Sequence, residues 1–102
     1  MFKTGDILVC EFGYNCRLVN FYEVVGVTKS GQSVRIRNLK EKFVSHDGYG
    51  QNGYVVPNLE GPTKPIKGTF RVDEGKYFGE YCKISGCYAT LWDGNPEAFY
   101  TD

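Results

Sequence analysis

The sequence has no long apolar run, no positively charged leader and no segment with the apolar stripe of a helix. A membrane-spanning helix needs about 18 or more consecutive apolar residues, so none is expected. Residues 1–6 lack the charged segment and apolar block of a secretory signal. Thirteen glycines and four prolines interrupt the chain too often for long helices. These absences predict an intracellular, cytoplasmic protein without a membrane partner.

Net charge and metal-binding spacings are missing as well. Twelve Lys and Arg residues balance twelve Asp and Glu residues, which argues against a basic nucleic-acid clamp and against an acidic mimic of DNA. Cys10 and Cys16, like Cys82 and Cys87, lie too far apart for the tight pair of a zinc knuckle, and His46 is the single histidine. We expect no metal and no cofactor. Without a secretory signal disulfides are disfavoured, so Cys10 is predicted to be a buried free thiol.

Catalytic motifs are also absent from the sequence. An enzyme would have to join His46 to a cysteine and a carboxylate, and no motif that activates a thiolate surrounds any cysteine. Several carboxylates lie beside glycines, which is the usual context of turns. No glycine-rich phosphate loop opens a helix. The sequence therefore favours a non-catalytic protein, and an enzyme of unknown type with such a pocket is the third alternative.

What the sequence does contain is apolar alternation with a period of two residues, which is typical of β-strands. This alternation occurs in residues 7–12 and again in residues 33–39. In the second segment the even-numbered residues, including Asn38, are predicted to face the core. In residues 20–26 both faces carry apolar side chains, which predicts a strand that is covered on both sides. Further strands are expected at residues 67–72 and 81–88, with a short element at 89–92.

Residues 45–65 differ from the rest of the chain, because glycine and proline surround a short apolar centre. We interpret this segment as a long loop within one domain, since neither flank is long enough to fold alone. Tyr49 and Tyr54 are the amphipathic side chains that we expect to anchor a partner there. An ordered structural flap is the alternative.

Together these patterns predict an all-β fold in a single domain, residues 1–102. Short strands, an early hairpin and a long glycine-rich loop favour a small SH3-like, partly open β-barrel or roll of about five to six strands. Closure of the barrel would hide the sheet edges and would place residues 13–20 on one rim. Phe12, Phe21 and Trp92 are predicted to lie in the core.

Four segments together resemble a known family: GDILVCEFGY, NFYEVVGVTKSGQSVRIR, YVVP and CKISGCYATLWDG. The family consists of small uncharacterised bacteriophage and mobile-element proteins with a GD, an aromatic-Gly-Tyr triplet, an FYxVVxV run and an LWDG close. The chain departs from it at Phe12, at residues 16–18 and at residues 86–87. The resemblance implies a phage accessory protein in the cytoplasm of a bacterial host, and it implies no catalytic residues.

The leading functional hypothesis is an inhibitor or modulator that binds a host protein, such as a component of anti-phage defence. Exposed aromatic and polar side chains near the rim are the natural contacts. The predicted partner-binding residues are Tyr14, Asn15, Arg17, Asn20, Tyr22, Tyr49 and Tyr54. Tyr14 and Tyr22 are expected to be exposed, because their hydroxyls need partners and asparagines are near.

The alternative is a nucleic-acid or nucleotide binding module. Its predicted contacts are Arg35, Arg37, Lys40 and Lys42. A second, sparser basic group consists of Lys64, Lys67 and Arg71. Unless these groups meet on one surface, we expect them to be the solvated face of strands.

Overall fold

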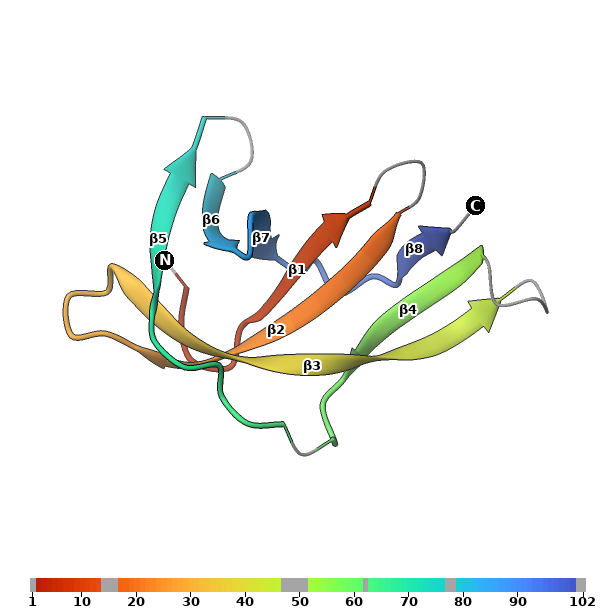
Figure 1. The fold of residues 1–102 in the computed structure, drawn as a ribbon, viewed down its shortest axis with the longest axis horizontal. Coiled ribbons are helices and arrows are strands. Elements are labelled where there is room, and N and C mark those ends of the chain that lie inside the picture. The colour runs from red at the N-terminus through yellow and green to blue at the C-terminus, as the bar shows by residue number, and fades with distance from the viewer. Residues whose placement is uncertain (1, 14–16, 47–51, 62, 77–78, 101–102) are drawn as a thin grey trace.

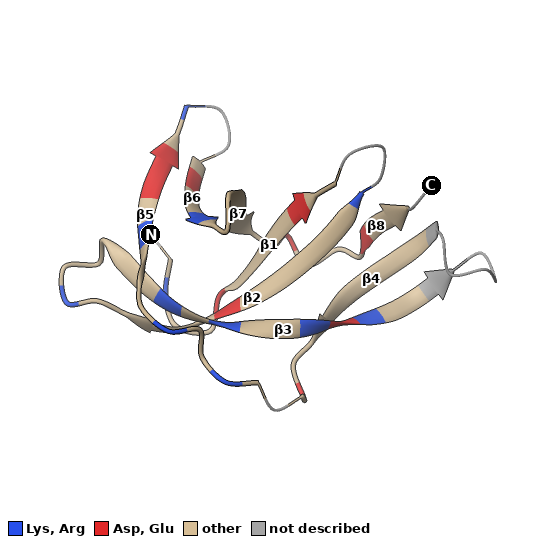
Figure 2. Cartoon of the chain, in the orientation of Figure 1, with Lys and Arg blue, Asp and Glu red and all other residues tan. Residues whose placement is uncertain are grey.

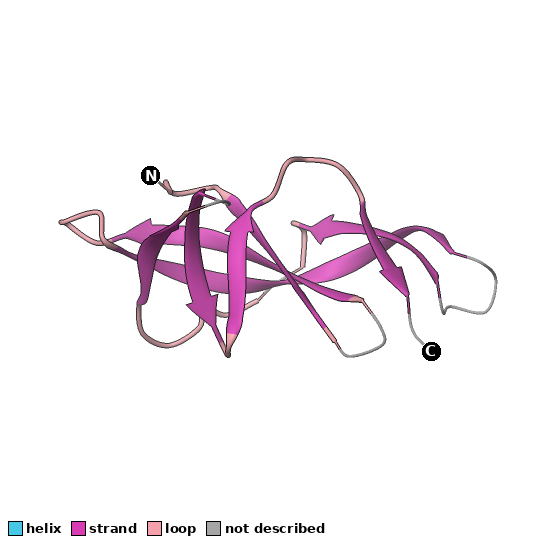
Figure 3. Ribbon diagram, turned by 90° about the horizontal axis from the view of Figure 1, so that it is seen from above, coloured by secondary structure: helices cyan, strands magenta, loops and turns pink. Residues whose placement is uncertain are grey.

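The computed structural model describes residues 2–13, 17–46, 52–61, 63–76 and 79–100 (Figure 1). Over these residues the fold consists of eight antiparallel strands and contains no helix (Figure 3). The strands are β1 (Ile7–Phe12), β2 (Leu18–Val27), β3 (Ser33–His46), β4 (Asn52–Asn58), β5 (Phe70–Gly75), β6 (Gly79–Ile84), β7 (Cys87–Leu91) and β8 (Glu97–Tyr100). The all-β prediction is confirmed, with more strands than expected.

Six of the strands form a partly open barrel. They follow one another in the order β2-β1-β7-β6-β5-β3, and an additional pairing of β2 with β3 closes the ring. The closure is uneven, because β1 and β2 pair along their whole length whereas β3 and β5 share only the pairs Ser33–Arg71 and Val34–Phe70. This arrangement agrees with the partly open barrel expected from the sequence.

The long strand β3 continues beyond the barrel and builds a second, smaller sheet (Figure 1). Its second half pairs with β4, and β4 pairs with β8. An isolated bridge between Tyr100 of β8 and Arg17, the residue before β2, connects this second sheet to the beginning of β2. The expected long loop at residues 45–65 is therefore partly strand, because β4 finds its second partner in residues far along the chain, which local sequence does not reveal.

Two cores lie on opposite faces of β1 and β2. The barrel core contains even-numbered residues of the first three strands and closing residues from β6 and β7: Leu8, Cys10, Tyr22, Val24, Val34, Ile36, Cys82, Ile84 and Ala89, together with Phe2. The second core contains Val19, Phe21, Leu39, Val55 and Phe99. The prediction that the strand at residues 20–26 is covered on both sides is confirmed, because a strand that serves two cores must be apolar on both faces.

Three expectations about single side chains are wrong. Phe12 ends β1 beyond the reach of the barrel core and is 43% exposed, whereas Tyr22 lies inside that core. Asn38 is exposed and Leu39 is buried in its place, because β3 passes from the barrel core to the second core between these positions. Phe21 is fully buried as expected, and its ring meets the partly buried Trp92 edge to face at 5.8 Å.

The expectation of a free thiol at Cys10 is also wrong, because Cys10 and Cys87 form a disulfide. Strands β1 and β7 are neighbours in the ring, and the two Cα atoms lie 6.3 Å apart, a normal separation for a disulfide. The partners are separated by 77 residues, so spacing in the sequence gave no hint of the pairing. Cys82 is a buried free thiol, and burial raises its pKa to about 11.

Candidate functional site

A groove opens where strands β2 and β3 separate. Their ladder ends at the pair Phe21–Leu39, and no ladder pair joins residues 18–20 to residues 40–43. The opposite edges of these two segments are already used, by β1 and β4 respectively. Two strand edges therefore face the opening without a neighbouring strand between them.

Two adjoining cavities make up this β2–β3 groove. One has a volume of about 530 Å³ and the other of about 280 Å³, and both are lined by Val19, Asn20, Glu41 and Phe43. The larger cavity is otherwise lined by Asn38, Leu39, Lys40 and Thr63. The smaller one is otherwise lined by Phe12, Leu18 and Phe99. The groove is thus polar at one end and aromatic at the other.

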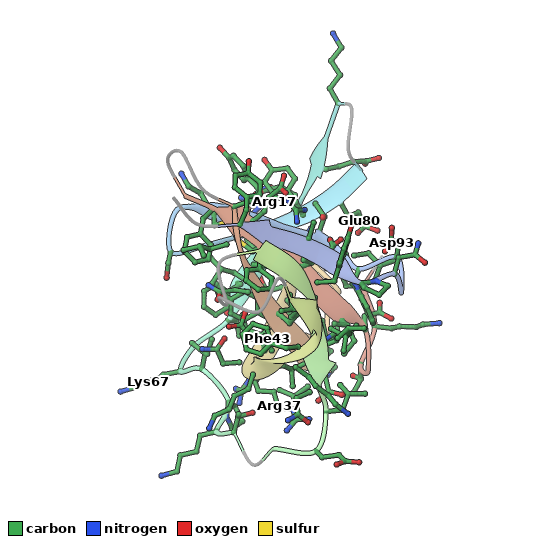
Figure 4. The ribbon with its side chains drawn as sticks, turned by 90° about the vertical axis from the view of Figure 1, so that its right-hand side faces the viewer. Arg17, Arg37, Phe43, Lys67, Glu80 and Asp93 are labelled. Atoms are coloured by element: carbon green, nitrogen blue, oxygen red, sulfur yellow. A yellow bond between two sulfur atoms is a disulfide. The ribbon has the colours of Figure 1, made fainter. Side chains whose placement is uncertain are left out.

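Two exposed phenylalanines line the aromatic end. Phe12 is 43% exposed and Phe43 is 54% exposed, and the Phe43 ring meets Phe99 edge to face at 5.3 Å. Figure 4 looks onto this end of the molecule, with Phe43 below Arg17. Because Phe99 belongs to the tightly packed second core, the Phe43 ring rests against a rigid neighbour. Large aromatic side chains on rigid supports are the usual anchors of protein interfaces.

The polar end offers hydrogen-bonding groups. Asn20 and Asn38 are exposed amides that both donate and accept hydrogen bonds. The Oγ1 atom of Thr63 is buried and has no hydrogen-bond partner among the described residues. A buried hydroxyl without a partner is unfavourable, so this atom gains from a ligand that supplies one.

Arg17, which the sequence singled out for partner binding, is occupied within the fold. Its Nε atom lies 2.6 Å from Glu11 Oε2, its Nη2 atom lies 4.0 Å from Glu97 Oε1, and its Nη1 group donates to the carbonyl oxygen of Ala98. Burial raises the pKa of Glu97 above its usual value, and Arg17 opposes that rise. We therefore assign Arg17 to the attachment of β8 to β1 and β2.

The other predicted partner-binding residues have mixed outcomes. Asn20 lines the β2–β3 groove, and Tyr54 is exposed on β4. Tyr22 is buried, contrary to expectation; burial raises the pKa of its phenol, and a hydrogen bond with Asn20 opposes the rise. Tyr14, Asn15 and Tyr49 lie outside the described residues. Sequence reasoning missed Phe43, whose only signal is an apolar residue after the charged run at residues 40–42.

The four basic residues of the alternative hypothesis do not share one face of β3. Arg35 and Arg37 alternate with Val34 and Ile36, which point into the barrel core, so both arginines point outward. Lys40 and Lys42 occupy even positions farther along the strand and are exposed on its other side. The structure thus separates this set into two pairs.

Comparisons with known proteins leave the resemblance to bacteriophage proteins as a prediction. No family model, no curated protein sequence and no solved structure matches the chain. In the part of the chain that the structure describes, no three His, Cys, Asp or Glu residues come together as a metal site. No helix in the same residues is long and apolar enough to cross a membrane.

Proposed function

We propose that this protein is a non-catalytic binding module that takes an extended segment of a partner protein into the β2–β3 groove. The observation that carries the proposal is the end of the β2–β3 ladder at Phe21–Leu39, which leaves two strand edges facing an open groove with exposed phenylalanines. An extended peptide that adds to a strand edge gains main-chain hydrogen bonds, and pockets for its alternate side chains select its sequence.

The groove residues divide the recognition between them. Phe12 and Phe43 contact apolar side chains of the segment. Binding costs these two phenylalanines little conformational entropy, because each side chain has few rotatable bonds. Asn20 and Asn38 hydrogen-bond to its main chain at the polar end. This division predicts an extended segment that is apolar at one end and polar at the other.

The partner in this proposal is a host protein in the cytoplasm of a bacterium, and the module is a phage or mobile-element accessory protein that inhibits or modulates it. The resemblance of residues 5–14, 20–37, 54–57 and 82–94 to small phage proteins supports this setting. A host segment held in the groove is withdrawn from its normal contacts, which is the simplest route to inhibition. A component of anti-phage defence is the class of host protein that a phage gains most by inhibiting.

Affinity capture from a bacterial lysate tests the proposal when wild type is compared with two variants. Phe43→Ala removes an anchor, and Leu91→Ala removes an exposed apolar side chain of β7 outside the groove. Truncating an interface anchor weakens binding by about 2 kcal/mol or more, roughly 30-fold. We expect a salt-resistant partner that wild type and Leu91→Ala retain and Phe43→Ala loses, while all three melt at similar temperatures.

Hydrogen exchange locates the binding site of the captured partner. Added strand pairing must slow the exchange of those amides in residues 18–20 and 40–43 that point into the groove, because the alternate amides already face β1 or β4. A partner that Phe43→Ala retains, or protection confined to other strands, contradicts the proposal.

A further inference from the structure

The neutral total charge conceals a strong separation of charge along the chain. Residues 24–72 contain eight of the twelve Lys and Arg residues but three of the twelve Asp and Glu residues, so this segment carries a net charge of +5 and the remainder carries −5. In Figure 2, most positions coloured along β3 and the segment below it are blue, with a few red ones among them, whereas red positions also mark β1, β2, β5, β6 and β8. The middle of the chain therefore carries the excess of positive charge.

Part of the positive region forms a continuous surface. Residues 66–72 run beside residues 32–36, because the Ile66 N–H donates to the Ile36 carbonyl and the Val72 N–H donates to the Gln32 carbonyl, both at 2.8 Å. A bridge between Arg37 and Pro65 extends this contact. The outward side chains along it make up the basic face: Arg35, Arg37, Lys64, Lys67 and Arg71.

Figure 4 labels two cations of the basic face and two carboxylates that lie apart from them. Arg37 and Lys67 are at the lower end of the molecule, whereas Glu80 and Asp93 are in its upper half. An anion that approaches from the side of Arg37 and Lys67 is attracted by these cations. Electrostatic steering therefore favours this orientation.

Two of the five cations on the basic face form ion pairs with described residues, and three do not. Arg37 pairs with Glu23 at 2.5 Å, and Arg71 pairs with Asp73 at 3.2 Å while remaining 80% exposed. Arg35, Lys64 and Lys67 are exposed and have no ion pair with any described residue. Exposed ion pairs are weak, so the Arg71 pair exchanges readily for a stronger anion.

No exposed aromatic ring accompanies these cations within residues 32–37 and 63–72, all of which the structure describes. Phe70, the only aromatic residue in the described parts of 32–37 and 63–72, packs partly buried against the barrel core. Proteins that hold single strands combine cations with aromatic rings on which bases stack. A face with cations alone is suited to contact phosphates and not bases.

We propose that the basic face binds the phosphate backbone of a nucleic-acid duplex without reading its sequence. A DNA duplex carries one negative charge per ~1.7 Å of its axis, more than a single strand offers. Alternate residues of a strand are about 7 Å apart, and neighbouring strands are about 5 Å apart. The cations of the basic face therefore lie within a patch whose length is on the order of 15 Å. This surface shares no residue with the β2–β3 groove.

Fluorescence anisotropy with a labelled duplex of about 20 base pairs tests this inference, with the single strand of the same length beside it. Three or four phosphate contacts predict a slope of about −3 in log affinity against log salt, a loss of roughly 50-fold between about 50 and about 200 mM salt. We expect the duplex to bind more tightly than the single strand. No binding at low salt, or a preference for the single strand, overturns the proposal.

Charge-matched variants locate the contact. Arg35→Gln with Lys67→Gln removes two cations from the basic face, and Lys3→Gln with Lys83→Gln removes two exposed cations elsewhere. We expect the first pair to weaken duplex binding about tenfold or more and to reduce the salt slope by about 2, and the second pair to leave the slope unchanged. Equal losses in both double variants overturn the assignment to this face. Phe43→Ala must leave duplex binding unchanged.

Discussion

Replacement of Phe21 by alanine tests whether the two cores form one cooperative unit. Phe21 is fully buried in the second core, where it packs near Val19, Leu39 and Val55 and meets Trp92 at 5.8 Å. Phe→Ala substitutions in packed cores cost about 3 to 5 kcal/mol, because the transfer free energy is lost and a cavity remains. Domains of this size unfold with about 5 to 15 kcal/mol, so much of the stability is lost.

The shared strands decide how this loss is distributed. Strands β1, β2 and β3 contribute side chains to both the barrel core and the second core, so neither core persists when the other unfolds. We therefore expect Phe21→Ala to unfold in a single transition with a lower midpoint temperature. At about 4 to 8 °C per kcal/mol the midpoint falls by about 12 °C or more.

Two probes of chemical and thermal unfolding check this expectation. Far-ultraviolet circular dichroism follows all strands, whereas fluorescence of Trp92, the single tryptophan, reports on the second core. The matched variant Ile36→Val removes one methylene from the barrel core and costs about 0.5 to 1.5 kcal/mol. Both variants must shift both probes together. Separate transitions, or a loss below about 1 kcal/mol for Phe21→Ala, refute the reasoning.

Two further predictions concern the cysteines and Glu97. Reduction of the Cys10–Cys87 disulfide, which spans 77 residues, is expected to lower the free energy of unfolding by about 4 kcal/mol, because the unfolded chain gains conformational entropy. Denaturation with and without reductant measures this loss, and an unchanged midpoint contradicts the prediction. Because burial raises the pKa of Glu97, its ionisation opposes folding, so wild type loses stability relative to Glu97→Gln as the pH rises through that pKa. Unfolding of both proteins at acid and neutral pH checks the sign, and a wild type that gains stability relative to the variant between acid and neutral pH contradicts it.

Local pattern predicted the strands better than it predicted their surroundings. The alternation in residues 7–12 and the apolar faces of residues 20–26 correctly indicated β1 and a doubly covered β2. The same alternation placed Phe12 in the core, because a period of two residues says nothing about where a core ends. The prediction that Asn38 is packed was wrong for the same reason, since β3 leaves one core and enters another at this position.

The candidate site was predictable only in part. Asn20 was singled out as a polar residue near the rim and does line the β2–β3 groove. Phe43 was missed, because its role depends on Phe99 and on the end of the β2–β3 ladder. The basic face joins Arg35 and Arg37 to the second basic group through the contact of residues 66–72 with β3, which no local spacing encodes.

The sequence by itself determined the β-strands, their inward and outward faces and the absence of helices in the described residues, because these follow from side-chain periodicity and turn residues near one another in the chain. Only the tertiary structure decided the ring closure, the Cys10–Cys87 disulfide, the two cores and the groove. Each of these depends on which distant strands become neighbours, and that choice is made by the packing of the whole chain.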